Sequence, residues 1–233
     1  MQEKYLYLAL DLFTLSVPLL RSFESRLSYY KSFGPLFLAI ALSALVFIPW
    51  DAFFTARGIW GFNPRYLIGQ HFWGLPIEEI LFFVVVPFSC IFIYRVLNYF
   101  LPQDPPQWVG QSLAKFLVWF PLGIATLNVQ RWYTFTTFLL LGLLMAYHVY
   151  LKKTPWLPKF LRAFGLILVP FMLVNGVLTG TGIPQEVVWY NNAHNLGIRL
   201  STIPFEDAFY GMALILLNVS LYEYFLSLRL KVQ

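Results

Sequence analysis

The sequence contains a single cysteine, Cys90, among its 233 residues. One cysteine excludes an internal disulfide framework and a cysteine-based metal cluster. Because Cys90 lies within an apolar run, we interpret it as a small buried hydrophobic residue. The three histidines, His71, His148 and His194, do not share a metal-binding spacing, and no G-x-G-x-x-G motif is present. We therefore expect neither a metal nor a flavin or nicotinamide cofactor. A metal site at His71 and His194 is the alternative, because each of these residues precedes an acidic motif.

Charged residues are also scarce. They make up 12 % of the chain, whereas a soluble domain has roughly 25 %. Hydrophobic residues reach 59 % and the mean hydropathy is +0.65. These values indicate an integral membrane protein, and a soluble globular domain is excluded. The net charge of +5 is small, so we relate it to orientation in the bilayer rather than to nucleic-acid binding.

Seven apolar segments approach the length of about 20 residues that a membrane-spanning helix needs. They cover residues 5–20, 34–50, 77–97, 113–127, 132–151, 160–179 and 204–228. No segment shows the alternation of a half-buried strand. The expected fold is all-α, a polytopic membrane protein with about seven transmembrane helices. The first segment lacks a clear basic region and an A-x-A site, so we expect it to be retained as a span.

The basic residues divide unevenly between the two ends of such a bundle. With seven spans, one end holds eleven of them: Arg21, Arg26, Lys31, Arg95, Lys115, Lys152, Lys153, Lys159, Arg162, Arg229 and Lys231. The other end holds five: Lys4, Arg57, Arg65, Arg131 and Arg199. The positive-inside rule places the first end in the cytoplasm. The N-terminus and the two long loops, 51–76 and 180–203, are then expected on the outer face.

These two loops carry an internal repeat. The segment GFNPRYLIGQHFWGLPIEEILF (61–82) aligns with WYNNAHNLGIRLSTIPFEDAFY (189–210) at a constant offset of 128 residues. The matched residues are Asn63 with Asn191, Gly69 with Gly197, Pro76 with Pro204, Glu78 with Glu206, and Glu79 with Asp207. Upstream, Asp51 matches Asn175 at an offset of 124. The pattern indicates an old duplication.

The repeat predicts how the chain is organised. Residues 1–100 form one three-helix repeat and residues 131–233 form the second. Residues 101–130 contain the Pro-rich stretch LPQDPPQW and a fourth helix that links them. An odd number of helices in each repeat would invert the second copy, and the linking helix restores its orientation. Both motif loops are therefore expected on the same face of the membrane.

The acidic pairs Glu78-Glu79 and Glu206-Asp207 each follow a proline at the start of an apolar segment. Acids at a helix start complement the helix dipole, and this explains one acid per helix without a function. Ionisable residues at a membrane boundary are costly and point to a functional site. Neighbouring helical residues point about 100° apart, so one acid of each pair can face a cavity. We favour Glu78 and Glu206 for that position.

A buried carboxyl group beside another can stay protonated and act as an acid, while a hydrogen-bonded partner stays ionised and acts as a base. Asn63 and Asn191 are candidates for supplying such hydrogen bonds. Aromatic residues gather in the same two loops. An interfacial belt explains most of them. A π-rich lining that stabilises a cation is the alternative, and its candidates are Trp60, Trp73, Trp189 and Tyr190.

The sequences GIWGFNPRYLIG…LPIEE and IPFED together resemble the small integral-membrane lycopene cyclases. In that family a P-x-E-[ED] motif occurs once in each of two similar domains, which form separate subunits or one fused chain. This chain resembles the fused form over nearly its whole length. The second motif departs from the first in having Asp207 where the first has Glu79.

The resemblance implies that the chain cyclises the ψ-ends of lycopene, or of a related acyclic carotenoid, without net redox change. Glu78, Glu79, Glu206 and Asp207 would then be the catalytic carboxyl groups. We expect β-rings as the product, a bacterial inner membrane as the location, and no nucleic-acid partner. The oligomeric state stays open.

Two other classes of protein fit parts of the pattern. A proton-coupled secondary transporter also has duplicated repeats with buried polar sites, although those sites usually lie in broken helices at mid-membrane. A scaffold or assembly subunit would lose assembly, and no reaction, when Glu78 and Glu206 are neutralised.

Overall fold

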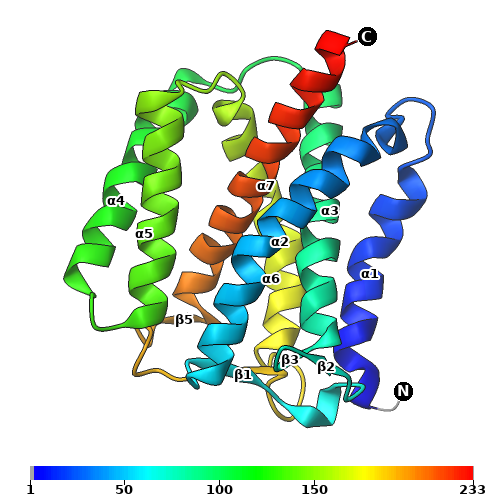
Figure 1. Ribbon diagram of the computed structural model, residues 1–233. Coiled ribbons are helices and arrows are strands. Elements are labelled where there is room, and N and C mark those ends of the chain that lie inside the picture. The colour runs from blue at the N-terminus through cyan, green and yellow to red at the C-terminus, as the bar shows by residue number, and fades with distance from the viewer. Residues whose placement is uncertain (1–2, 233) are drawn as a thin grey trace.

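A computed structural model describes residues 3–232 of the chain, with side chains described as far as residue 229. Seven long helices dominate these residues (Figure 1). Their bounds are α1 (Leu6–Arg21), α2 (Phe33–Ala56), α3 (Ile77–Phe100), α4 (Ala114–Leu127), α5 (Trp132–Ala146), α6 (Leu157–Leu178) and α7 (Phe205–Val232). The expected all-α, polytopic membrane fold is confirmed.

Five of the seven helical runs are long and apolar enough to cross a membrane alone. They are Tyr29–Ala56, Ile77–Phe100, Trp132–Leu151, Leu157–Leu178 and Phe205–Arg229. The first includes the 3-10 turn η2 (Tyr29–Ser32), and the third includes the π-helical turn η5 (Tyr147–Leu151). The helices α1 and α4 are shorter, but the turns η1 (Glu3–Tyr5) and η4 (Val109–Leu113) precede them directly. Each run passes from one end of the bundle to the other (Figure 1).

The loops gather at the two ends as the charge distribution predicts. The N-terminal end, residues 57–76, residues 128–131 and residues 179–204 lie at one end (Figure 1). The remaining connections lie at the end where α7 finishes. Which end faces the cytoplasm stays a prediction of the positive-inside rule.

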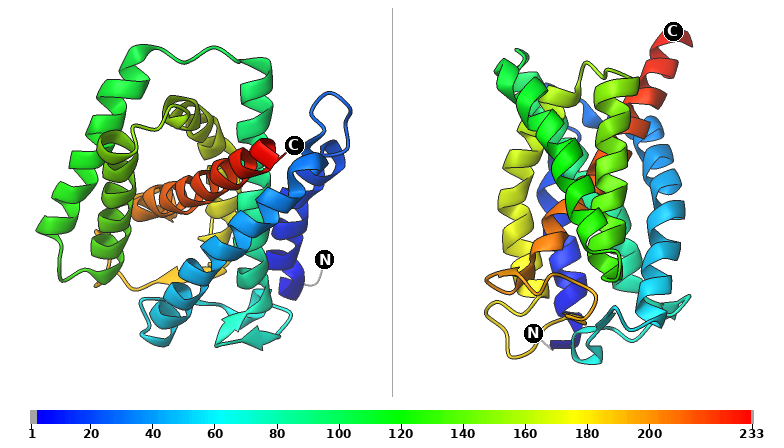
Figure 2. Two further views of the ribbon diagram at one scale, coloured as in Figure 1. Left: turned by 45° about the horizontal axis from the view of Figure 1, so that its top comes forward. Right: turned by 90° about the vertical axis from the view of Figure 1, so that its left-hand side faces the viewer.

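The helices of the two halves interlock. Within each half the first helix packs on the third, as α1 on α3 and α5 on α7. Between the halves, α2 packs on α7 and α6 packs on α3. The helix α7 therefore runs through the middle of the bundle, whereas α4 lies at its edge against α5 (Figure 2). A continuous apolar core joins both halves.

Short strands cap the end of the bundle that carries the motif loops. They are β1 (Trp60–Phe62), β2 (His71–Phe72), β3 (Leu75–Pro76), β4 (Val188–Tyr190), β5 (Arg199–Leu200) and β6 (Ile203–Pro204). They form three antiparallel pairs, β1 with β4, β2 with β3, and β5 with β6. The sequence gives no sign of these strands, because two or three residues are too few to show alternation.

The pair β1–β4 lies on an approximate two-fold axis. Its register places Trp60 opposite Tyr190, Gly61 opposite Trp189, and Phe62 opposite Val188. The repeat offset of 128 maps Gly61 onto Trp189 itself, so the axis passes between these two residues. A Cβ atom at Gly61 would overlap the indole ring of Trp189. Glycine is therefore required at this crossing.

Matched hydrogen bonds extend the symmetry on either side of the axis. The Asn63 backbone N donates to the Val187 carbonyl at 2.8 Å, and the Asn191 backbone N donates to the Ile59 carbonyl at 2.9 Å. The Asn63 side chain donates to the Glu186 carbonyl at 3.2 Å. The Asn191 side-chain amide donates to the Gly58 carbonyl at 3.3 Å. These contacts support two repeats, whose boundaries at 1–100 and 131–233 stay a proposal.

We expect Asn63→Ala and Asn191→Ala each to destabilise the fold, because each removes a side-chain bond between the two halves. Loss of such a bond costs about 1 kcal/mol. For a chain of this size the midpoint of thermal unfolding then falls by about 2–4 °C. Thermal unfolding in detergent would measure the shift. Gln70→Ala is the control, since this exposed residue lies in the same loop, and an equal shift in Gln70→Ala would contradict the assignment.

Candidate active site

A cavity of about 350 Å³ lies between α1, α3, α6 and α7, beneath the strand pair β1–β4. Most of its wall is apolar. Most of the polar groups lie at the end near the strands: Tyr7, Glu79, Tyr133, Asn175, Tyr190, Asp207 and Tyr210. An apolar cavity with a few convergent polar groups is the usual form of a site for an apolar small molecule.

The local fold of each motif loop fixes the direction of its two acids. The strands β3 and β6 end at Pro76 and Pro204, and α3 and α7 begin at the next residue. The first acid of each pair points back at its own loop. The Glu78 carboxylate accepts the Ile68 backbone N–H at 2.7 Å, and the Glu206 carboxylate accepts the Leu196 backbone N–H at 2.7 Å.

This placement corrects the expectation that Glu78 and Glu206 face the cavity. Both side chains are buried, but neither lines it. The second acids, Glu79 and Asp207, line it instead. Because successive helical residues point about 100° apart, an acid that closes the loop leaves its neighbour facing the interior.

Each second acid accepts a hydrogen bond from a tyrosine of the first helix in its half. The Tyr7 hydroxyl donates to Glu79 at 2.5 Å, and the Tyr133 hydroxyl donates to Asp207 at 2.5 Å. Tyr7 and Tyr133 are 126 residues apart. The two halves therefore build the same carboxyl–tyrosine contact.

Beyond this contact the two halves differ. Asp207 receives two further hydrogen bonds, from the Asn175 side-chain amide at 2.8 Å and from the Tyr190 hydroxyl at 3.0 Å. Phe62 occupies the position equivalent to Tyr190 and has no hydroxyl. With three donors, Asp207 is supported as an ionised carboxylate.

Glu79 faces another carboxyl group where Asp207 faces an amide. Asp51 lies beside Glu79, close enough for each carboxyl group to affect the charge of the other, and it is the residue that the repeat matches with Asn175. One Asp51 oxygen accepts the Trp60 indole N–H at 2.5 Å and the Thr55 hydroxyl at 3.3 Å, and the other has no donor. Two carboxyl groups in contact form a hydrogen bond only when one carries a proton. The Asp51–Glu79 pair is therefore suited to hold a proton.

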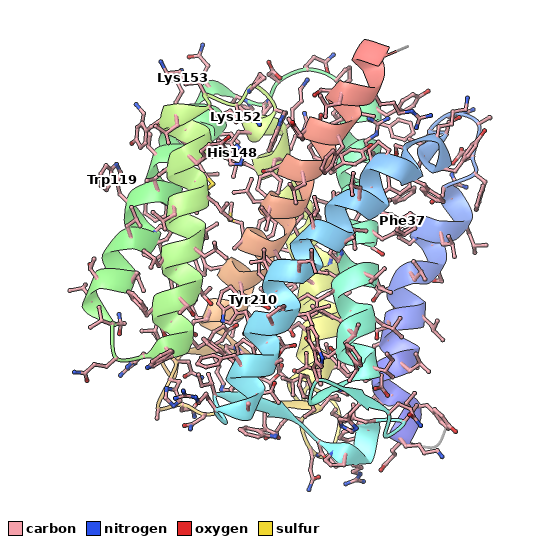
Figure 3. All side chains as sticks on the ribbon, viewed as in Figure 1. Phe37, Trp119, His148, Lys152, Lys153 and Tyr210 are labelled. Atoms are coloured by element: carbon pink, nitrogen blue, oxygen red, sulfur yellow. The ribbon has the colours of Figure 1, made fainter. Side chains whose placement is uncertain are left out.

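Tyr190 lies in β4, outside the helices, and its hydroxyl stays a donor. Burial, and then the adjacent Asp207 carboxylate, hold the pKa of Tyr190 well above its usual range. The hydroxyl therefore keeps its proton and keeps donating to Asp207. Tyr210, on α7 and labelled in Figure 3, lines the same cavity as Glu79 and Asp207.

The structure separates the remaining candidate residues into two groups. Trp60 and Tyr190 line the cavity. Trp73 is 66 % exposed in the turn between β2 and β3, and Trp189 covers Gly61 beside the axis. Asn63 and Asn191 bind loop backbone and not the acids. The expectation that these two asparagines hydrogen-bond a catalytic acid was wrong, because their side chains are used to join the halves.

Sequence reasoning missed Asp51, Asn175, Tyr7 and Tyr133 as site residues. The match of Asp51 with Asn175 was visible at offset 124. Asp51 lies 28 residues from Glu79 along the chain, so the sequence did not connect the two. The tyrosines follow a third offset, 126, which a fixed alignment does not reveal. Among the residues that the structure describes, no group of three His, Cys, Asp or Glu side chains is placed to hold a metal ion.

A family model described as lycopene cyclase matches residues 4–97 and 130–225. The chain belongs to the lycopene cyclase family. The two matched regions coincide with the two halves that surround the cavity, and the family resemblance seen in the sequence is confirmed.

Curated relatives in this family come from fungi. The chain is 32 % identical over 78 residues to the bifunctional lycopene cyclase/phytoene synthase of Gibberella fujikuroi, a match of 34 % of this chain and 13 % of that protein. It is 32 % identical over 81 residues to the protein of the same name in Podospora anserina, covering 31 % and 14 % respectively. In Neurospora crassa the identity is 29 % over 70 residues, covering 27 % and 12 %. The chain thus matches about an eighth of the length of these relatives. No solved structure shows a significant match.

Glu78 and Glu206 are expected to stabilise the fold through their loops. Glu78→Ala and Glu206→Ala leave a backbone N–H without its acceptor, which costs about 1–3 kcal/mol. Glu78→Gln and Glu206→Gln keep an acceptor oxygen and should retain most of the stability. Thermal unfolding in detergent would compare the four variants. Equal losses for the alanine and glutamine variants would contradict this role.

Proposed function

We propose that this chain is a lycopene cyclase that closes the ψ-ends of lycopene, or of a related acyclic carotenoid, inside the membrane. The observation that supports it most directly is the cavity, whose long apolar wall carries two carboxyl groups, Glu79 and Asp207. Glu79 and Ile93 both line the cavity, and their separation of 14 positions corresponds to about 21 Å along a helix. That length suits an end group together with part of a polyene.

The reaction requires a proton to be added and another to be lost. Protonation of the terminal double bond at C2 leaves a cation at C1. The C5=C6 electrons then form the C1–C6 bond, which moves the cation to C5. Loss of the C6 proton gives a β-ring, and no electrons are exchanged with a cofactor. An acid and a base that line the same cavity are sufficient for this reaction.

We assign the proton donor to the Asp51–Glu79 pair and the base to Asp207. Glu79 lines the cavity and shares its environment with a second carboxyl group, which favours a protonated form. Asp207 accepts hydrogen bonds from Tyr133, Asn175 and Tyr190, which favours the ionised form. The proton that Asp207 takes must return to Glu79 before the next cycle, and Tyr210 lines the cavity that both groups share.

Aromatic rings surround the position where the cation forms. The Trp60 ring lies 5.1 Å from that of Tyr133 and 6.0 Å from that of Tyr210, measured between centroids. The Tyr133 and Tyr190 rings stack at 5.8 Å. The faces of such rings attract a cation. The apolar wall also keeps water away, which prevents capture of the cation as an alcohol.

A proton-coupled transporter is the alternative function, since it would also use duplicated repeats and buried acids. Here α3 and α7 begin at the acids and continue without a break, whereas transporter sites use helices broken at mid-membrane. We also propose a bacterial inner membrane as the location of the chain. The fungal relatives do not support this location.

Pigment analysis tests the proposed function. The chain is expressed in cells that accumulate lycopene, beside Glu79→Gln and Asp207→Asn at equal protein levels. We expect ring-bearing carotenes from the parent and a loss of about 10²–10⁴-fold in each variant, the usual contribution of a positioned acid or base. Glu78→Gln is the matched control, because it changes a carboxyl group of the same motif that does not line the cavity. Unchanged lycopene with folded parent protein would refute the cyclase.

Asp51 is expected to act through Glu79. Asp51→Asn replaces a proton-sharing partner with an amide that can donate to an ionised Glu79, so protonated Glu79 becomes less favoured. We expect kcat to fall at least about 10-fold with little change in KM, because Asp51 does not line the cavity. Turnover measured with lycopene in proteoliposomes separates the two constants. Thr55→Val is the control, since it removes only the long contact to Asp51; an equal loss there, or a change confined to KM, would contradict this role.

A further inference from the structure

The two-fold axis generates two equivalent places for a cavity. The observed cavity lies between α1 and α3 of the first half and α6 and α7 of the second. The equivalent place lies between α5, α7, α2 and α3. No α2 residue lines the cavity that the described residues form. The two places therefore differ, although the repeats that build them are related.

The equivalent space between α2, α3, α5 and α7 is filled by side chains that are larger than their counterparts in the cavity wall. Val174, Leu178 and Gly211 line the open cavity. The repeat offsets match them with Trp50, Phe54 and Phe83. These three aromatic residues contribute to one packed cluster. The Trp50 ring lies 5.7 Å from that of Phe54 and 5.3 Å from that of Tyr210. Phe83 and Phe54 are buried.

A polar contact closes the deeper part of the second place. Cys90 and Ile167 line the open cavity, and the offsets match them with Asn218 and Ser43. The Asn218 side-chain amide donates to the Ser43 hydroxyl at 2.7 Å, and both residues are buried. A bond between facing helices fixes them together. An apolar chain thus finds no room along this side.

The open cavity reaches the lipid-facing surface between α1 and α6. Phe13 and Val17 on α1 line it and are 71 % and 61 % exposed. Pro170 on α6 lines it from the other side and is also exposed. In a bundle surrounded by lipid, this opening leads into the bilayer rather than into water. An apolar substrate can enter here without crossing the polar end of the molecule.

We infer that the chain has one composite active site, entered from the bilayer between α1 and α6, and that it converts one end of the polyene at each visit. This inference rests on the proposed function. Each half supplies one carboxyl group to the site, Glu79 from the first and Asp207 from the second. The rest of the polyene extends past Cys90 and out between the helices. A substrate with two ψ-ends must leave and re-enter before its second ring is closed.

A substitution that fills the cavity as its filled counterpart is filled tests the assignment of the site. Gly211→Phe introduces the residue that stands at the equivalent position, Phe83. A Cβ atom at Gly211 would lie 3.6 Å from Phe171, an ordinary contact, so the backbone tolerates a side chain. We expect ring formation to fall at least about 100-fold. Gly165→Phe is the control, because this helical glycine is exposed and has open space around it. Ring formation by Gly211→Phe at the parental rate would overturn the assignment of the site.

Cys90 provides a binding measurement that does not depend on turnover. As the single cysteine it is the only target for a membrane-permeant maleimide, and it lines the cavity. We expect lycopene in the vesicle to slow its modification several-fold in Glu79→Gln, which binds but does not react. Modification at the same rate with and without lycopene would overturn the path past Cys90. Failure of the proposed function appears separately, as absence of rings from the parent protein.

The order of products tests conversion at one end per visit. With excess lycopene in proteoliposomes, we expect a free one-ring carotene to appear first. Any two-ring product should follow after a lag, from re-entry of the one-ring compound. A one-ring compound that is never consumed also fits a single site. Two-ring product from the first turnovers, without a free one-ring compound, would overturn the inference.

Discussion

The burial of two neighbouring carboxyl groups, Asp51 and Glu79, is the constraint on which the site depends. Two carboxylates in an apolar bundle repel each other strongly, and one shared proton removes that repulsion. In the proposed mechanism this proton is held beside the cavity, which Glu79 lines. In the second half, the buried Asp207 carboxylate instead accepts hydrogen bonds from the Asn175 amide and the Tyr190 hydroxyl. Under the proposed mechanism, two differences, Asp51 against Asn175 and Phe62 against Tyr190, separate the proton donor from the acceptor in otherwise related halves.

Much of the fold could be predicted from the sequence because hydrophobic length and motif repetition are local properties. The seven helices and the pairing of the two P-x-E-[ED] segments were accessible in this way. The direction of each acid was not, because it depends on where the loop backbone returns. The N–H groups of Ile68 and Leu196 capture the first acid of each pair. Each of these N–H groups lies ten residues before its acid, and no sequence pattern marks the hydrogen bond.

The partners of the acids were hidden for a related reason. Tyr7 and Asp51 reach Glu79 from two different helices, and only packing brings them together. Asn63 illustrates the opposite error, since an amide near an acidic motif suggests a hydrogen bond to the acid. Its side chain instead binds backbone across the two-fold axis. Backbone groups at a junction between halves compete for such side chains, and they are already in place before any substrate binds.

The crossing of Gly61 and Trp189 has a consequence for the choice of partner during assembly. On a two-fold axis, identical halves would place two copies of the same residue face to face. Two tryptophans could not fit, because a single Cβ atom at Gly61 already overlaps the indole. Two glycines would leave the strand pair without that ring. The small–large pair is therefore complementary only between unlike halves, so it selects heterotypic over homotypic association.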